Sequence, residues 1–155
     1  MKQRKIILIG DLHFKSKEPY YSGTISFLKH IHSKYKNDIV IFTGDFFDSS
    51  SPDWKIYSES IQILTSFYQV HILLGNHDYS YLKNSSLKPL KYFQNIHIYE
   101  YPTTVKIQDL KILMLPHKDY TFMNKYYTNI ESECDYAICH FAPPGYGFGI
   151  GEIEL

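Results

Sequence analysis

The sequence predicts an α/β fold in which a parallel sheet is formed by the first half of the chain. Apolar runs occupy residues 6–9, 39–42 and 70–74, and two stretches with helical periodicity lie between them. Continuous apolar runs are typical of strands that are buried on both faces. The order strand–helix–strand–helix–strand favours parallel pairing with right-handed crossovers.

The two helices are predicted by apolar residues that recur every three or four positions. The first stripe consists of Ile25, Leu28, His32 and Tyr35, and it is widened by Phe27 and Ile31. A loop at 49–53 precedes the second helix, and its Ser, Pro and Asp residues are suited to a helix start. We expect the second stripe to consist of Trp54, Tyr57, Ile61, Leu64 and Tyr68.

The pattern changes in the second half of the chain. A short helix broken by Pro89 is predicted over residues 87–93, and 119–130 is weakly helical. Short strands are predicted at 96–99, 103–107 and 111–115, and we expect them to form a meander on a second sheet; a further strand is predicted at 136–139. Residues 143–151 alternate Gly with apolar residues and are predicted to be a loop. We expect residues 1–155 to form a single domain.

Length and charge narrow the classes of function. The 155 residues suffice for one buried core, and the formal net charge of zero argues against tight, charge-driven binding of DNA by this chain alone. The apolar stretch at 6–9 is too short for a signal peptide, and no window approaches the ~20 apolar residues of a membrane span. We therefore expect a cytoplasmic protein without a membrane partner.

Polar side chains follow four of the predicted strands at the point where each strand ends: Asp11 and His13, Asp45 and Asp48, Asn76 with His77 and Asp78, and His140. Taken singly, each is compatible with an ordinary turn or cap. The carboxyl ends of parallel strands lie along one edge of a sheet, so these side chains should meet there. Converging carboxylates repel each other unless a cation lies between them. Carboxylate, imidazole and amide groups suit Mn, Fe, Zn or Mg-like ions, and an Asp bridging two ions is typical of displacement at phosphorus.

The motifs resemble those of the calcineurin-like metallophosphoesterase superfamily, whose fold is a β-sandwich flanked by helices. They read Asp11-x-His13, Gly44-Asp45-x-x-Asp48, Gly75-Asn76-His77-Asp78 and His140. The resemblance spans residues 5–145. Within the superfamily, the stretches at 95–99, 102–105, 112–116 and 137–141 are most similar to SbcD-type nuclease subunits and bacteriophage recombination endonucleases.

The resemblance implies a role for each of these residues. Asp11 and His13 would hold one divalent ion, Asn76 and His140 a second, and Asp45 would bridge both. His77 would face the scissile phosphate, Asp78 would orient His77, and Asp48 would support the site through hydrogen bonds. The implied activity is hydrolysis of a phosphodiester, most plausibly in DNA, with Mn preferred and Mg, Fe or Zn as alternatives. The implied partners are an SbcC-like coiled-coil ATPase subunit and a second copy of the chain.

The sequence departs from the superfamily at its end. The family's later Gly-His-x-His motif, which supplies one His to each ion, does not follow His140. We therefore expect a C-terminally incomplete version of the domain, with three protein ligands for each ion and with weaker metal binding and reduced activity. Two alternatives remain open: a binding or scaffold module that has the fold without turnover, and a phosphatase or phosphodiesterase acting on a nucleotide or a phosphoprotein.

Overall fold

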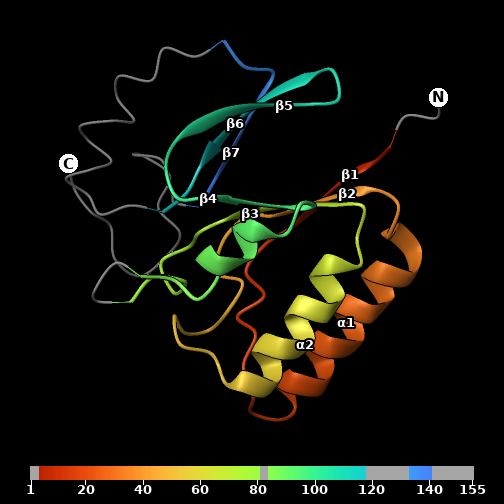
Figure 1. Ribbon diagram of the computed structural model, residues 1–155, viewed down its shortest axis with the longest axis vertical. Helices are drawn as coiled ribbons and strands as arrows, with labels where there is room; N and C mark the ends of the chain where they lie inside the picture. Colours follow the sequence, from red (N-terminus) through yellow and green to blue (C-terminus); the bar gives the residue numbers. More distant parts are fainter. Residues whose placement is uncertain (1–3, 81–83, 118–132, 141–155) are drawn as a thin grey trace, which may run out of the picture.

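A parallel sheet of four strands lies at the centre of the computed structural model, which describes residues 4–80, 84–117 and 133–140 (Figure 1). Its strands are β1 (Ile6–Ile9), β2 (Ile39–Phe42), β3 (Gln69–Leu73) and β4 (Ile96–Tyr99), and they lie side by side in this order. Neighbouring strands pair in parallel throughout. The parallel pairing predicted for the first three strands is confirmed.

The prediction that the strand at 96–99 belongs to the second sheet is wrong. This strand belongs to the first sheet as β4, beside β3, and not to a meander on the second sheet. Between β3 and β4 the chain forms a 3-10 helix, η1 (Lys88–Tyr92), where a short helix was predicted. The Asn95 side chain then donates hydrogen bonds to main-chain carbonyls at the end of the second helix, namely those of Leu64, Thr65 and Phe67. These bonds hold the start of β4 next to β3.

A second sheet covers one face of the first. In the described part of the chain it consists of β5 (Thr103–Ile107), β6 (Leu110–Leu115) and β7 (Tyr136–Cys139). β5 and β6 form an antiparallel hairpin, and β7 pairs in parallel with β6, which confirms the strands predicted here. The helix predicted at 119–130 and the loop predicted at 143–151 lie outside the described residues.

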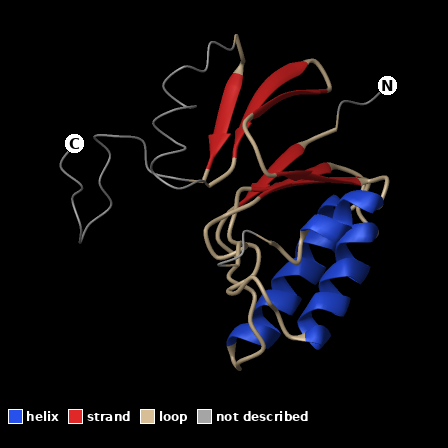
Figure 2. Ribbon diagram, turned by 60° about the vertical axis from the view of Figure 1, so that its left-hand side comes forward, coloured by secondary structure: helices blue, strands red, loops and turns tan. Residues whose placement is uncertain are grey.

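The helices α1 (Tyr20–Tyr35) and α2 (Trp54–Thr65) pack on the opposite face of the first sheet (Figure 2). Side chains of β2 alternate accordingly: Val40 and Phe42 pack towards the helices, and Ile39 and Ile41 pack towards the second sheet. Asp53 caps α2 by accepting a hydrogen bond from the Lys55 N–H at 2.8 Å. Neither helix in the described residues is long and apolar enough to cross a membrane.

The stripe predicted for the second helix is only partly right. The helix ends at Thr65, so Tyr68 lies beyond it, and Trp54 at its start is 76% exposed. Ile56 and Leu64 are the buried apolar residues of α2, and Tyr57 and Ile61 are half-buried against the same core. The exposed Trp54 is the first residue of α2 and directly follows the loop at 43–53.

A histidine in the layer between the sheets makes the fold sensitive to acid. His71 is 3% exposed and hydrogen bonds to the Tyr99 hydroxyl at 2.7 Å, and burial together with the charge of His97 lowers the pKa of His71 to about 3. Between pH 6.5, the ordinary pKa of histidine, and about pH 3, His71 binds a proton in the unfolded chain but not in the folded chain. The free energy of unfolding should therefore fall by about 1.4 kcal/mol per pH unit in this window from this residue. Urea unfolding of the metal-free protein at several pH values measures the slope, which His71→Gln should reduce and His30→Gln, on exposed α1 surface, should not.

Candidate metal centre

The carboxyl ends of β1, β2 and β3, together with the end of β7, deliver the predicted site residues to one place. Two groups of side chains could each hold a metal ion, and within each group the possible ligand atoms all lie within 4.8 Å of one another. One group is His13, Asp45 and His77, and the other is Asp11, Asp45 and His140. Asp45 belongs to both groups, so the structure contains two adjacent sets of possible metal ligands that share one carboxylate.

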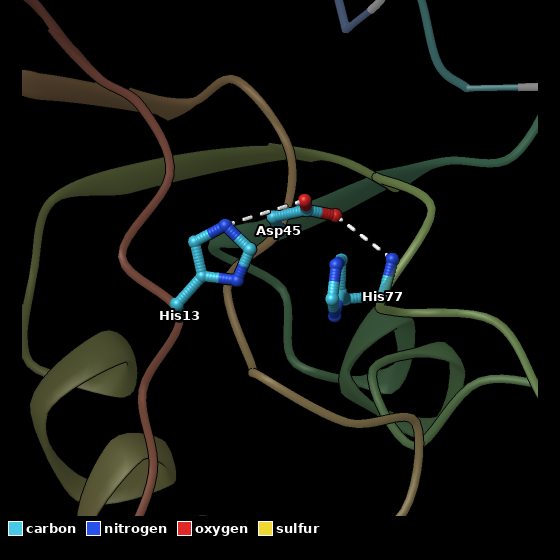
Figure 3. Close-up of side chains that lie close together, drawn as sticks. All are labelled: His13, Asp45 and His77. Carbon is cyan, nitrogen blue, oxygen red and sulfur yellow. Dashed lines mark hydrogen bonds and ion pairs between the residues drawn. The ribbon is translucent and has the colours of Figure 1, made fainter. Parts of the chain in front are cut away.

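Asp45 is the centre of this arrangement (Figure 3). It is 4% exposed, its Oδ1 accepts the N–H of His77 at 2.9 Å, and its Oδ2 lies 3.5 Å from His13 Nε2 and 3.3 Å from His140 Nε2. Burial acts to raise the pKa of Asp45, but the hydrogen bonds from His140 and from the His77 N–H, and the charges of both rings, together lower it. The carboxylate is therefore charged and accepts interactions from both sides.

His140 is held in an orientation suited to a ligand. Its Nδ1 donates to the Thr43 carbonyl at 2.9 Å, which directs Nε2 to Asn76 Oδ1 at 3.2 Å and to Asp45 Oδ2. Burial acts to lower the pKa of His140, but the hydrogen bond and charge of Asp45, with help from Thr43 and Asp11, raise it. His140 Nε2, Asn76 Oδ1 and Asp45 Oδ2 thus converge on one place, where a bound cation would meet nitrogen and oxygen donors together.

The backbone at the site is strained. Asp11, His13 and Asp45 have φ angles of 47°, 43° and 47°, in the left-handed region that residues other than glycine rarely adopt. Gly44 has a φ of 118°, and a Cβ at this position would collide with the His140 ring. Such strain costs of order 1–3 kcal/mol per residue and is found mainly at functional sites. The fold maintains it here at the residues that form the two groups.

Asp78 connects the two central turns. It is 1% exposed, and its carboxylate accepts main-chain N–H groups of Gly75 at 2.8 Å, Phe47 at 3.2 Å and Phe46 at 3.4 Å. Burial raises the pKa of Asp78 to about 6, and these three hydrogen bonds oppose the rise. In the structure Asp78 thus links the turn after β3 to the turn after β2.

The contact to the His77 ring that we expected from Asp78 comes from Asp48. His77 Nδ1 lies 3.1 Å from the Asp48 main-chain carbonyl oxygen. The Asp48 carboxylate pairs with His13 Nδ1 at 3.4 Å and with Lys15 Nζ at 3.4 Å. Asp48 therefore supports two histidines of the site, one through its main chain and one through its side chain.

His117, which was not among the residues predicted from the sequence, also lies near this site. His117 follows β6, its N–H donates to the Leu74 carbonyl at 2.8 Å, and its ring centroid is 6.4 Å from that of His140. β6 and β7 are parallel neighbours, so their ends reach the same edge. The signal was present in the sequence, because His117 comes after the predicted strand 111–115 much as His140 comes after 136–139.

The residues at this edge fit divalent cations. Carboxylate, imidazole and amide oxygen donors converge from Asp11, His13, Asp45, Asn76, His77 and His140. Buried Asp45 has no lysine or arginine among its described ion pairs; its partners are histidines. A donor set of this kind is the usual environment of Mn, Fe or Zn, and the shared carboxylate is suited to a pair of ions.

Comparison with known proteins identifies the family of the chain. The family model described as calcineurin-like phosphoesterase matches residues 4–152. A probable glycerophosphodiester phosphodiesterase GpdQ from Arcobacter nitrofigilis is 32% identical over 83 residues, which cover 47% of this chain and 29% of the relative. The chain thus spans less than a third of that relative's length. A solved structure of a protein of unknown function from Aquifex aeolicus has a TM-score of 0.49 at 19% identity, over 85% of this chain and 75% of the other. The family match covers most of the residues, and the chain belongs to the calcineurin-like phosphoesterase family.

Proposed function

We propose that this chain hydrolyses phosphodiesters with two divalent cations held on either side of Asp45. The observation that supports this proposal most directly is the membership of Asp45 in both ligand groups. His13 would hold one ion, Asn76 and His140 the other, and Asp11 lies with the His140 group. When bound, divalent ions neutralise charge on the phosphoryl group and activate water at neutral pH. Manganese is the expected ion.

His77 is the proposed catalytic residue. Its ring is exposed, and the hydrogen bond of Nδ1 to the Asp48 carbonyl leaves Nε2 for a substrate. Its main-chain N–H donates to Asp45, which fixes the residue beside the shared carboxylate. From this position the imidazole would stabilise charge on the phosphate or protonate the leaving oxygen.

The relative from Arcobacter nitrofigilis bears the name of a diesterase, and the stretches at 95–99, 102–105, 112–116 and 137–141 resemble those of SbcD-type nuclease subunits. Both support a diester as the substrate in preference to a monoester. We propose DNA as the natural diester, with the fold itself providing the metal centre and a partner chain providing further contacts. A phosphatase would instead prefer monoesters, so relative rates on the two substrate types distinguish these functions.

The test is hydrolysis of bis(p-nitrophenyl) phosphate with added Mn²⁺, compared between the wild-type chain and His77→Ala. We expect His77→Ala to lower kcat about a hundredfold, since a positioned acid or charge stabiliser contributes about that much or more. Bound manganese should stay unchanged, and His30→Ala on α1 serves as the control for loss of an exposed histidine. Equal rates for wild type and His77→Ala would contradict the proposed role, and loss of an ion would make His77 a ligand instead.

A further inference from the structure

We infer that Lys15 and Tyr20 form a substrate subsite beside the metal centre that favours nucleic acid strands over glycerol-type diesters. The inference rests on the proposed diesterase function and specifies its substrate class. Lys15 lies on the loop between β1 and α1, and the exposed Tyr20 is the first residue of α1; the metal centre uses neither side chain. In this position they would bind the phosphate and the base next to the scissile bond.

The loop that carries Lys15 is held rigidly against the site. The N–H of His13 donates to the Asp45 carbonyl at 2.9 Å, and the N–H of Phe14 donates to the Phe46 carbonyl at 3.0 Å. The N–H of Asp48 returns a bond to the Phe14 carbonyl at 3.2 Å. Loops 10–19 and 43–53 therefore run side by side from the sheet edge towards the starts of α1 and α2 (Figure 1). Lys15 follows directly, so its backbone position relative to Asp45 is fixed.

The Asp48 carboxylate lies between Lys15 and His13 of the metal centre. Lys15 Nζ lies 3.4 Å from Asp48 Oδ1, and the same oxygen lies 3.4 Å from His13 Nδ1. The side chains of Lys15 and Asp48 are 34% and 38% exposed, so an incoming anion can reach the ammonium group. Exposed ion pairs of this kind are weak. A phosphate of a bound strand can therefore replace Asp48 as the hydrogen-bonded anion beside Lys15.

Tyr20 provides a face for a base next to this cation. It is 56% exposed, begins α1, and has its ring centroid 4.7 Å from Lys15 Nζ. A second lysine–tyrosine pair joins the starts of the two helices, where Lys55 Nζ of α2 lies 4.1 Å from the ring centroid of the half-buried Tyr21 of α1, and the neighbouring Trp54 is 76% exposed. Alternating lysines and exposed rings are typical of surfaces that bind single-stranded nucleic acid, in which phosphates meet cations and bases stack on rings.

Nearby acidic side chains are engaged within the fold. Glu18 accepts the Ser22 N–H at 3.2 Å, Asp53 accepts the Lys55 N–H, and Glu59 accepts the Tyr21 hydroxyl at 2.7 Å. Their negative charges weaken the positive electrostatic potential of the lysines. Affinity for a nucleic acid strand should therefore come from short-range contacts at Lys15 and from stacking. A glycerophosphodiester has neither a second phosphate nor a base, and it would gain nothing from these two residues.

The experiment compares Lys15→Met and Tyr20→Leu with wild type on two substrates, a short single-stranded oligothymidylate and glycerophosphoethanolamine. For each variant we expect KM for the oligothymidylate to rise about tenfold at unchanged kcat, since stacking or a phosphate contact contributes about that factor. Kinetic constants for glycerophosphoethanolamine should not change, and Lys15→Arg should restore the wild-type KM. Lys34→Ala is the matched control, because Lys34 pairs with the Tyr35 ring at 5.1 Å at the far end of α1.

Binding without turnover separates this inference from the proposed function. Fluorescence anisotropy of labelled oligothymidylate should show weaker binding by Lys15→Met, with a salt dependence reduced by about 0.7 in log Kd per log salt for one lost phosphate contact. If wild type binds but hydrolyses neither substrate, the proposed function fails and the subsite stands. If wild type hydrolyses diesters and the variants change both substrates equally, or neither, the subsite is overturned and the function stands.

Discussion

Replacing Asp45 with asparagine is expected to abolish binding of two cations and to lower diester hydrolysis by at least about a thousandfold, equivalent to about 4 kcal/mol. The amide keeps an oxygen that can accept the His77 N–H, now at 2.9 Å from Oδ1. It removes the charge that both ligand groups share. Elemental analysis after equilibration with Mn²⁺ and the rate on bis(p-nitrophenyl) phosphate measure the two effects.

The matched control is Asp38→Asn. Asp38 precedes β2 as Asp45 follows it, and its Oδ1 also accepts a main-chain N–H, that of Lys5 at 3.0 Å. This substitution should leave metal content and rate unchanged. Circular dichroism of the metal-free proteins should be alike for wild type and both variants. Two ions retained by Asp45→Asn would show that the shared carboxylate is not the bridge.

Replacing Gly75 with alanine should lower the free energy of unfolding by about 3 kcal/mol or more, at the upper end of overpacking effects. An added Cβ would collide with the side chain of Asp45 and with its main-chain nitrogen. Neither neighbour can retreat, because the Gly75 N–H is bonded to Asp78 at 2.8 Å and Asp45 accepts the His77 N–H. Urea unfolding of the metal-free protein gives the size of the effect.

Gly23→Ala is the control for this substitution. Gly23 lies within α1, and a Cβ there meets nothing within 4 Å. Alanine should therefore stabilise the helix by about 0.5–1 kcal/mol. An unfolding midpoint for Gly75→Ala equal to that of wild type would mean that the two turns are not in tight contact. Loss of Mn²⁺ binding by Gly75→Ala, at temperatures where it remains folded, would trace the collision to Asp45.

Most of the architecture could be predicted because its signals are local. The run at 39–42 is apolar at every position, as a strand covered on both faces must be, and the structure covers it with helices on one side and a second sheet on the other. The run at 6–9 forms the edge strand β1, in which Leu8 is 58% exposed, so the prediction that this strand is buried on both faces is wrong. The expectation that strand ends meet at one edge follows from parallel pairing alone. It correctly brought Asp11, His13, Asp45, His77 and His140 together.

The placement of β4 could not be predicted in this way. Its sequence is typical of a short strand whichever sheet it joins. The structure pairs it with β3, and the preceding Asn95 donates to three carbonyls at the end of α2. These contacts join residues about 30 positions apart. Sequence periodicity contains no information about such distant partners, so the strand was predicted correctly and its sheet was not.

The residues of the metal centre could thus be identified from the sequence, because each follows a predicted strand whose end must lie at the edge of the sheet. The contacts that each residue makes could not be identified in this way. Whether Asp78 bonds to His77 or to three main-chain N–H groups, and whether the Asp48 carbonyl orients His77, depends on how the turns after β2 and β3 interlock. The left-handed φ angles of Asp11, His13 and Asp45 are likewise seen only in the folded chain. Contacts between turns that are distant in the sequence set these details, and a local sequence pattern does not specify them.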